Sequence, residues 1–233
     1  MTDTALKSDE VARFLAAHPD FFEQHPELLG DIAIPHPQNG QAISLVERQS
    51  MILRGRIGAL EAKMAQMIRH GEENDAIADR VVQWARTLLA EADAARLPEL
   101  ALRELMSLFA VPFGAVRVWQ VAPAYAGMGA AAAVSDDVKR LASSMVAPFC
   151  GSNVGFEPAQ WMTAADGSPA SDVQSLAMLP LRVGASPEAF GLLVLGSPDK
   201  ERFHITMGTA FLTRIGELAS AALSRLRAEP ARG

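Results

Sequence analysis

The chain has 233 residues, with 27 acidic and 21 basic side chains and a formal charge of −6. This balance excludes an overall cationic nucleic-acid scaffold, and 49% hydrophobic with 21% charged residues is typical of an ordinary folded protein. The single cysteine, Cys150, excludes an internal disulfide and a multi-cysteine zinc site.

The start of the chain is polar, and residues 1–10 carry four charged side chains where a signal peptide would be apolar. The longest uncharged runs, 118–135 and 141–156, both contain glycine and proline, which argues against a membrane span. We therefore expect a cytoplasmic protein with no membrane partner.

Residues 1–43 are predicted to form an N-terminal helical arm. Two similar phrases, at residues 18–22 and 25–29, each place a proline and an acid at a helix start with an apolar pair behind them. Ser8 is the predicted N-cap of the helix before them. Helices this short are marginal alone, so they must pack on each other, on the next helix or on another protein. We expect a protein partner to bind through this arm.

Residues 44–94 are predicted to form a long helix that begins at a capping box of Ser44 and Glu47. Apolar residues then recur at heptad spacing, which is typical of a coiled coil. Gly71 and the pair Asn74-Asp75 disturb the pattern, so a stutter or a break near 71–75 is expected. Such a seam needs a partner, and we expect a homodimer through Val46, Leu53, Ile57, Leu60, Met64 and Met67.

Residues 95–228 alternate between helical and strand-like patterns, which predicts an α+β domain. The second of two apolar strands near the end has no polar face, so it should be central in the sheet. The expected elements are a helix opening at Pro98-Glu99, a strand at 113–121, a helix capped by Ser135 and ending near 146, strands at 175–183 and 189–195 joined by a turn at 184–187, and a last helix capped by Thr206.

Residues 175–197, with Phe203 and the closing helix, resemble the second half of a GAF domain. The chain as a whole is similar to the bacterial family called domain of unknown function 484. The phrases that carry this resemblance are residues 18–22, Pro35-His36, residues 44–49, Asn74-Asp75 and residues 196–199.

This resemblance implies a helical arm followed by a GAF-like antiparallel sheet flanked by helices, and it supplies no activity. GAF domains as a class bind small molecules, often cyclic nucleotides or tetrapyrroles, and dimerise through terminal helices. The residue set associated with cyclic-nucleotide-binding members is not found in this sequence.

A ligand site is predicted on one face of the sheet. Arg117 and Trp119 alternate with valines, so they share a face on which a planar or anionic ligand could lie. In the alternative, Trp119 belongs to the core and Arg117 reaches solvent. Cys150 is either a reactive or ligand-contacting thiol or a small buried hydrophobe. The candidate ligand-binding residues are Arg117, Trp119, Cys150, Phe156, Trp161, Met178 and Pro180.

The five histidines show no metal-ligand spacing, and no nucleophile elbow or phosphate-binding loop is present. We therefore expect no metal and no enzymatic activity, and the sequence names no cofactor. Basic residues on the long helix, from Arg48 to Arg69, are interpreted as a solvated coiled-coil flank, and no nucleic-acid partner is expected.

Two functions fit these observations. The first is a dimeric, non-enzymatic regulatory protein whose GAF-like domain senses a small molecule. The second is a structural or protein-interaction adaptor whose GAF-like pocket is filled by its own side chains.

Overall fold

The computed structural model describes residues 7–31, 33–35, 42–205 and 209–228, and it describes no side chain between residues 29 and 47. The chain divides into two compact units, residues 1–72, here called the arm unit, and residues 73–233, here called the sheet unit. One 46-residue helix, α4 (Leu45–Ala90), belongs to both units. It is continuous through residues 71–75, where the sequence had left a stutter or a break open.

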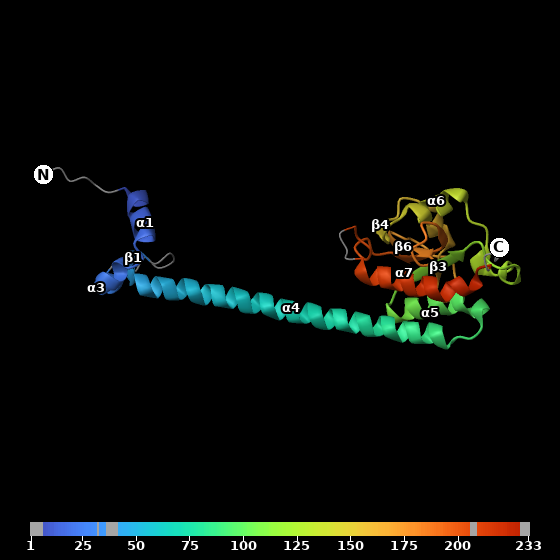
Figure 1. The fold of residues 1–233 in the computed structure, drawn as a ribbon, viewed down its shortest axis with the longest axis horizontal. Helices are drawn as coiled ribbons and strands as arrows, with labels where there is room; N and C mark the ends of the chain where they lie inside the picture. The colour runs from blue at the N-terminus through green and yellow to red at the C-terminus, as the bar shows by residue number, and fades with distance from the viewer. Residues whose placement is uncertain (1–6, 32, 36–41, 206–208, 229–233) are drawn as a thin grey trace. The chain divides into compact units, whose positions relative to one another are not determined.

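The arm unit begins with short helices, as the sequence predicted (Figure 1). The N-cap of the first helix is Lys7 and not Ser8, so that prediction was wrong by one residue. The predicted cap pair, Ser44 and Glu47, and the seam residue Val46 lie outside the described side chains. The elements are α1 (Ser8–Ala17), α2 (Phe21–Gln24), α3 (Pro26–Asp31) and an antiparallel pair of β1 (Ala33–Pro35) with β2 (Ala42–Ser44).

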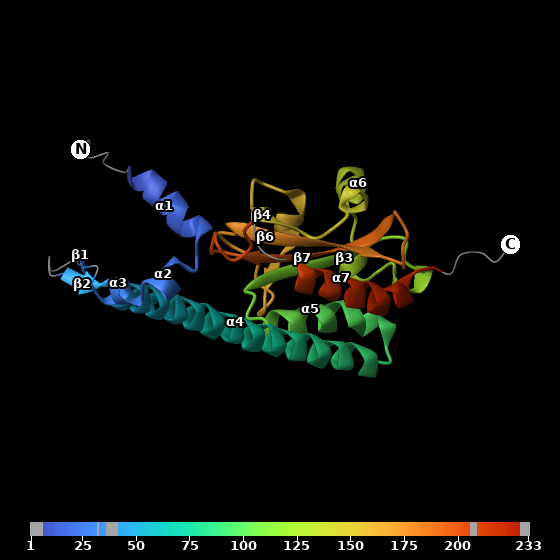
Figure 2. The ribbon, with the colours of Figure 1, turned by 60° about the vertical axis from the view of Figure 1, so that its left-hand side comes forward.

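The sheet unit contains the end of α4 and a five-stranded sheet with helices on both faces (Figure 2). Its helices are α5 (Leu97–Leu108), α6 (Asp136–Ser144) and α7 (Ala210–Leu223). Its strands are β3 (Phe113–Val118), β4 (Phe149–Ser152), β5 (Thr163–Ala164), β6 (Ser175–Arg182) and β7 (Ala189–Ser197). Its short 3-10 turns are η1 (Ala94–Arg96), η2 (Pro123–Tyr125), η3 (Gly129–Ala131), η4 (Glu157–Trp161) and η5 (Ser224–Leu226).

The strands are antiparallel in the order β4-β6-β7-β3-β5, so the predicted central position of β7 is confirmed. Sterics favour glycine at position 191 of β7, because a Cβ on Gly191 would lie 2.8 Å from the Arg117 carbonyl oxygen on β3. β3 ends at Val118, three residues before the end that the sequence predicted.

The two faces of the sheet carry separate apolar clusters, because successive side chains of a strand point to opposite sides. One cluster packs against α5, α7 and the end of α4, and includes Trp84, Leu179 and Leu193. The other packs against α6 and η4, and includes Met178 and Val194. Figure 2 shows α5 and α7 on one side of the sheet and α6 on the other. The predicted antiparallel sheet flanked by helices is therefore confirmed.

Ser135 caps α6 as predicted, because its Oγ accepts a hydrogen bond of 3.3 Å from the Val138 amide. The last helix begins at Ala210 after Thr209, and the predicted cap residue Thr206 lies outside the described residues. In the part of the chain that the structure describes, no helix combines the length and apolar character needed to cross a membrane.

Candidate functional site

Four of the predicted ligand-binding residues gather on the sheet face that α6 covers. Trp119, Phe156, Trp161 and Met178 all belong to, or pack against, the apolar cluster of that face. Trp119, directly after β3, and Met178 of β6 therefore lie on the same face of the sheet.

Side chains, however, pack the part of this face where a ligand cavity was predicted. Met178 is 1% exposed, and Met162, Leu176 and Leu192 beside it are equally inaccessible. The indole Nε1–H of Trp119 donates a hydrogen bond of 2.7 Å to the Ala189 carbonyl oxygen. The ring of Phe156 lies edge-on against Phe149 at 5.6 Å. These side chains fill the centre of the face themselves.

Cys150 lies apart from this group. It is part of β4, paired with Ala177, and it belongs to the cluster on the opposite face of the sheet. The thiol is 5% exposed, and burial raises the pKa of the Cys150 thiol. Since the thiolate is the reactive form, this position favours the interpretation of Cys150 as a buried hydrophobe.

A pocket of 460 Å³ opens at the rim of the packed face, along β3. Arg117 and Trp161 both line it, so two of the predicted residues do meet at a cavity. The rest of its wall comes from α5 and from the segment before α6. Its further lining residues include Glu99, Leu102, Met128, Gly129 and Thr163.

The guanidinium of Arg117 is held over this pocket by neutral groups. Its Nη1 donates a hydrogen bond of 2.9 Å to the Gly129 carbonyl oxygen, and its Cζ lies 5.7 Å from the centre of the Trp161 ring. Within the described residues, no carboxylate lies at ion-pair distance from Arg117. Burial lowers the pKa of Arg117, although an arginine stays protonated at neutral pH.

The pocket exists because β3 has an open edge. β5 pairs only with Phe113 and Gly114, so the rest of β3 has no strand on that side. The Trp119 amide donates to the Phe190 carbonyl, which fixes the alternation of hydrogen bonds with β7. It follows that Val116 and Val118 turn their backbone amides and carbonyls away from β7, toward the open edge.

Pro180 lines a second pocket, of 690 Å³, at the other side of the sheet unit. β4 pairs with β6 only as far as Met178, so Pro180 stands where β6 has become an edge strand and needs no amide hydrogen. Arg182 is also in this pocket, but its Nη2 is used by the carbonyls of Ala142, Ser143 and Met145 at the end of α6. Arg182 therefore has a structural role.

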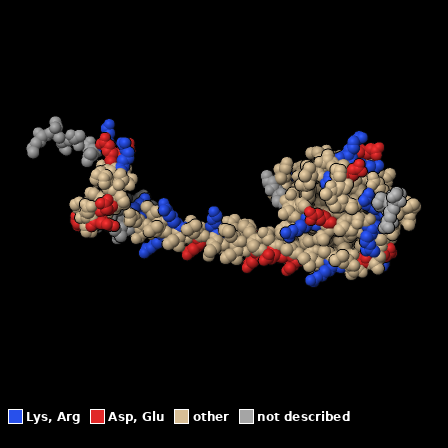
Figure 3. Space-filling view, viewed as in Figure 1, with Lys and Arg blue, Asp and Glu red and all other residues tan. Residues whose placement is uncertain are grey.

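The predicted dimer seam is a row of exposed apolar side chains on α4. Each described member is between 53% and 66% exposed, far above the exposure of a core residue. Figure 3 shows charged side chains interspersed along α4 with uncharged surface between them. The described residues of the row are Leu53, Ile57, Leu60, Met64 and Met67.

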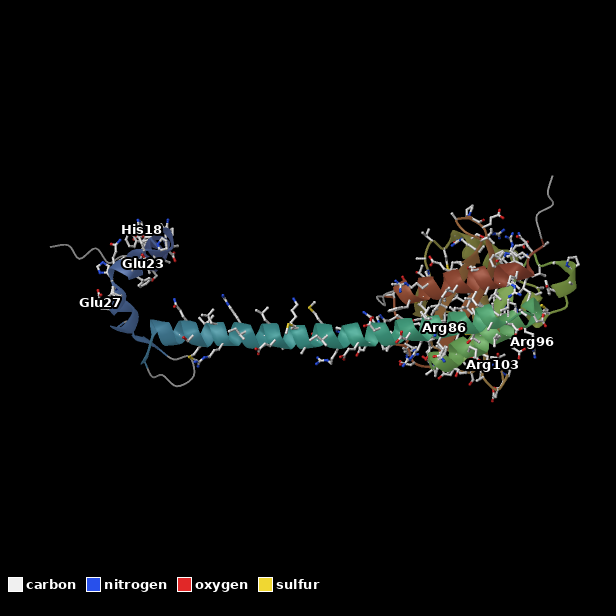
Figure 4. All side chains as sticks on the ribbon, turned by 60° about the horizontal axis from the view of Figure 1, so that its bottom comes forward. His18, Glu23, Glu27, Arg86, Arg96 and Arg103 are labelled. Carbon is white, nitrogen blue, oxygen red and sulfur yellow. The ribbon has the colours of Figure 1, made fainter. Side chains whose placement is uncertain are left out.

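The arm unit carries a small aromatic cluster beside exposed charges. The centre of the Phe21 ring lies 5.9 Å from that of Phe14, 5.3 Å from that of Phe22 and 5.0 Å from that of the His25 ring. Figure 4 labels three polar side chains of this part of the arm: His18 directly after α1, Glu23 on α2 and Glu27 on α3. The predicted apolar pair thus packs within the arm, while Phe14 remains half exposed. Binding of a protein partner through this arm stays a prediction.

The described residues contain no group of three His, Cys, Asp or Glu side chains that could hold a metal ion.

Together these features define an α+β protein, an antiparallel sheet between helical layers preceded by a helical arm. Residues 1–227 match the family model described as "Protein of unknown function, DUF484". The chain therefore belongs to the DUF484 family.

One curated relative is the "Uncharacterized protein YigA" of Salmonella typhimurium, which is 30% identical over 102 residues. The match covers 44% of this chain, and the chain spans 42% of that relative's length.

Solved structures with a similar arrangement show low sequence identity. A GAF domain from a candidate sensor histidine kinase of Pseudomonas syringae pv. tomato aligns with a TM-score of 0.43 and 18% identity, covering 67% of this chain and 91% of that one. The free methionine-R-sulfoxide reductase of Neisseria meningitidis, with its substrate, aligns with a TM-score of 0.43 and 12% identity, covering 64% and 88%. The GAF domain of an Acinetobacter phosphoenolpyruvate-protein phosphotransferase aligns with a TM-score of 0.43 and 10% identity. This alignment covers 64% of this chain and 92% of that one.

Several lining residues of the β3 pocket were missed by sequence reasoning. Glu99 was interpreted only as an acid at the start of a helix, and no functional role was predicted for Gly129. Neither residue type signals a pocket on its own. The one available signal was Arg117, a charged residue within an otherwise apolar strand, which requires something polar nearby.

Proposed function

We propose that this protein is a non-enzymatic regulatory protein that acts as a homodimer, paired through α4, and whose sheet unit binds a small molecule. The observation that carries the proposal is the exposed apolar row on α4, since a row of this kind in water favours association.

The heptad positions favour a parallel pair of helices. Leu53 and Leu60 take the d positions, and the β-branched Ile57 takes the a position between them. A β-branched residue at a with leucine at d is the combination that favours two parallel strands.

Charges beside the seam support the same arrangement with a second copy. In a parallel, in-register pair, Arg56 at position g faces the partner's Glu61 at position e. The neighbouring g–e pairs combine Gln49 with Arg54 and Lys63 with Ile68. Between residues 49 and 68, opposite charges therefore meet once on each side of the seam, and no g–e pair brings like charges together.

The row from Leu53 to Met67 is marginal by itself. Burying the exposed halves of ten such side chains in a dimer contributes on the order of 10 kcal/mol. Association costs about 4–15 kcal/mol in lost freedom. A stable dimer therefore needs further contacts.

The later part of α4 supplies them if the pattern has one stutter at 71–75. Beyond Met67, steps of 4 and 4 residues pass through Gly71 and Asp75, where the stutter interrupts the apolar row, and steps of 3, 4, 3 and 4 residues then lead to Ala78, Val82, Ala85 and Leu89. Val82 is 48% exposed and Leu89 is 85% exposed, whereas Trp84 and Leu88 on another face of the helix are buried in the sheet unit. We therefore assign Ala78, Val82, Ala85 and Leu89 to the same interface.

Disulfide trapping tests this arrangement in the full chain. The background variant carries Cys150→Ala, so that each introduced cysteine is the only one present. Leu60→Cys should oxidise to a covalent dimer, because equivalent d positions lie close together in a parallel, in-register pair. Ala62→Cys, on the outer face of the helix, is the matched control and should stay monomeric under denaturing electrophoresis. Equal yields from both variants would contradict the pairing.

The packed sheet face favours a second candidate, an adaptor with no small-molecule ligand. Small-molecule binding separates the two functions. In the ligand-binding protein the site is the β3 pocket, so Arg117→Gln should abolish binding, whereas the adaptor binds no small molecule in either form. Trp119 packs against the cluster in both cases, so Trp119→Ala should cost about 3–5 kcal/mol of unfolding free energy and is no test of the ligand.

A further inference from the structure

The β3 pocket contains a cation, Arg117, that no carboxylate of the described chain approaches to ion-pair distance. Nη1 of Arg117 donates a hydrogen bond to the Gly129 carbonyl oxygen and makes a longer contact of 3.5 Å with the Val116 carbonyl oxygen. Its Nε and Nη2 make no hydrogen bond to any other described residue. A half-buried guanidinium in this state is stabilised when an anion accepts hydrogen bonds from its remaining donors.

Other arginines of the sheet unit are already used. Arg103 and Arg140 pair with neighbouring acids, and Arg182 binds the carbonyls at the end of α6. Arg202 and Arg225 donate to backbone carbonyls. Arg117 differs from them because it combines free donors with a place on a pocket wall.

The rest of the pocket limits what the anion can be. Leu102, Met128 and Trp161 offer an apolar and aromatic wall, which suits a flat ring. Glu99 also lines the pocket, and its carboxylate disfavours a second negative charge. A volume of 460 Å³ admits a molecule of one or two rings.

We infer that the β3 pocket binds a planar, singly charged carboxylate, with its carboxylate on Arg117 and its ring against Trp161 and Met128. This inference names the ligand class of the proposed function and rests on it. The two oxygens of a carboxylate match the fork of a guanidinium, which makes the contact directional.

The position of the pocket connects such a ligand to α4. Leu102 of α5 lines the pocket, and its neighbour Ala101 accepts a hydrogen bond of 2.9 Å from the Trp84 indole of α4. A ligand that shifts α5 would therefore act on the part of α4 that lies in the sheet unit and carries the exposed Val82 and Leu89. By linkage, ligand affinity and dimer affinity then change by the same factor.

Isothermal titration calorimetry of the full chain with 2-naphthoate tests the assignment, with 2-naphthamide as the neutral control of the same shape. Naphthoate should bind at least about tenfold more tightly than the amide. Arg117→Gln should remove this preference, Arg117→Lys should restore part of it, and Arg140→Gln should leave it unchanged. Variants are compared only where their thermal unfolding matches the wild type.

A second variant keeps the test decisive if Arg117 substitutions unfold the chain. Glu99 is exposed, and Glu99→Gln should strengthen naphthoate binding and should strengthen binding of the doubly charged 2-naphthyl phosphate by a larger factor. No change in either affinity would overturn the placement of the ligand.

Equal binding of naphthoate and naphthamide would overturn the carboxylate class and leave small-molecule binding intact. No saturable binding of either probe up to about 10 mM, weaker than the usual range for a specific site, would overturn the inference. The dimer is measured separately, so its failure and the failure of this inference are distinguishable.

Discussion

The indole of Trp84 on α4 is fully buried, and its Nε1–H donates a hydrogen bond of 2.9 Å to the Ala101 carbonyl oxygen on α5. This contact ties the end of the long helix to the layer of helices beneath the sheet.

Trp84→Phe keeps an aromatic ring but loses this hydrogen bond, so the free energy of unfolding should fall by about 1–2 kcal/mol. Trp84→Ala also leaves a cavity and should cost about 3–5 kcal/mol. Urea denaturation followed by circular dichroism measures both. Gln83→Ala, at an exposed neighbouring position, is the control and should stay within about 0.5 kcal/mol of the wild type. Equal effects of Trp84→Ala and Gln83→Ala would contradict the packing.

Ser220 of α7 links two elements through one hydroxyl. Its Oγ donates to the Gly216 carbonyl at 2.6 Å and accepts from the Arg182 amide at 3.0 Å. Ser220→Ala leaves that amide without its acceptor and should cost about 1–3 kcal/mol in unfolding free energy. Ser224→Ala removes only a hydroxyl bonded to the Ala221 carbonyl and should cost less than about 0.5 kcal/mol. The idea fails if thermal melts rank the two variants the other way.

Burial raises the pKa of the Cys150 thiol, which gives stability a predictable pH dependence. The folded chain keeps the thiol proton at pH values where the unfolded chain, with a pKa of about 8.5, releases it. The folded state then holds more protons, so the free energy of unfolding falls as pH rises through that value. Urea denaturation of the wild type and of Cys150→Ala at pH 7 and at about pH 9.5 isolates this effect. The wild type should lose stability relative to the variant, and a constant difference would show that the thiol titrates alike in both states.

The sequence predicted those features that depend on local patterns. Ser135 caps α6 because its side chain needs only an amide three residues on, and β7 is central because it is apolar on both faces. The exposed row of α4 followed from heptad spacing alone. In each case the deciding contacts lie within a few residues or within one repeating pattern.

Features that depend on distant contacts could not be predicted in this way. An apolar pocket and an apolar core have the same composition, so the packing of Met178 and Trp119 was visible only in the structure. The β3 pocket arises because β5 stops after two residues, and Cys150 faces the opposite cluster because of the register of β4 with β6. No single segment encodes these pairings.

In the proposed dimer, α4 joins two copies of this chain. Sedimentation equilibrium of the full chain at micromolar concentration, about the range of a weak specific dimer, tests it directly. The wild type should sediment as a dimer. The double variant Leu53→Asp with Leu60→Asp should sediment as a monomer, because it would desolvate charges in the seam. The matched double variant Ala59→Asp with Ala62→Asp, on the outer face of the helix, should remain a dimer. A monomeric wild type, or a dimer that survives charges at Leu53 and Leu60, would contradict the account.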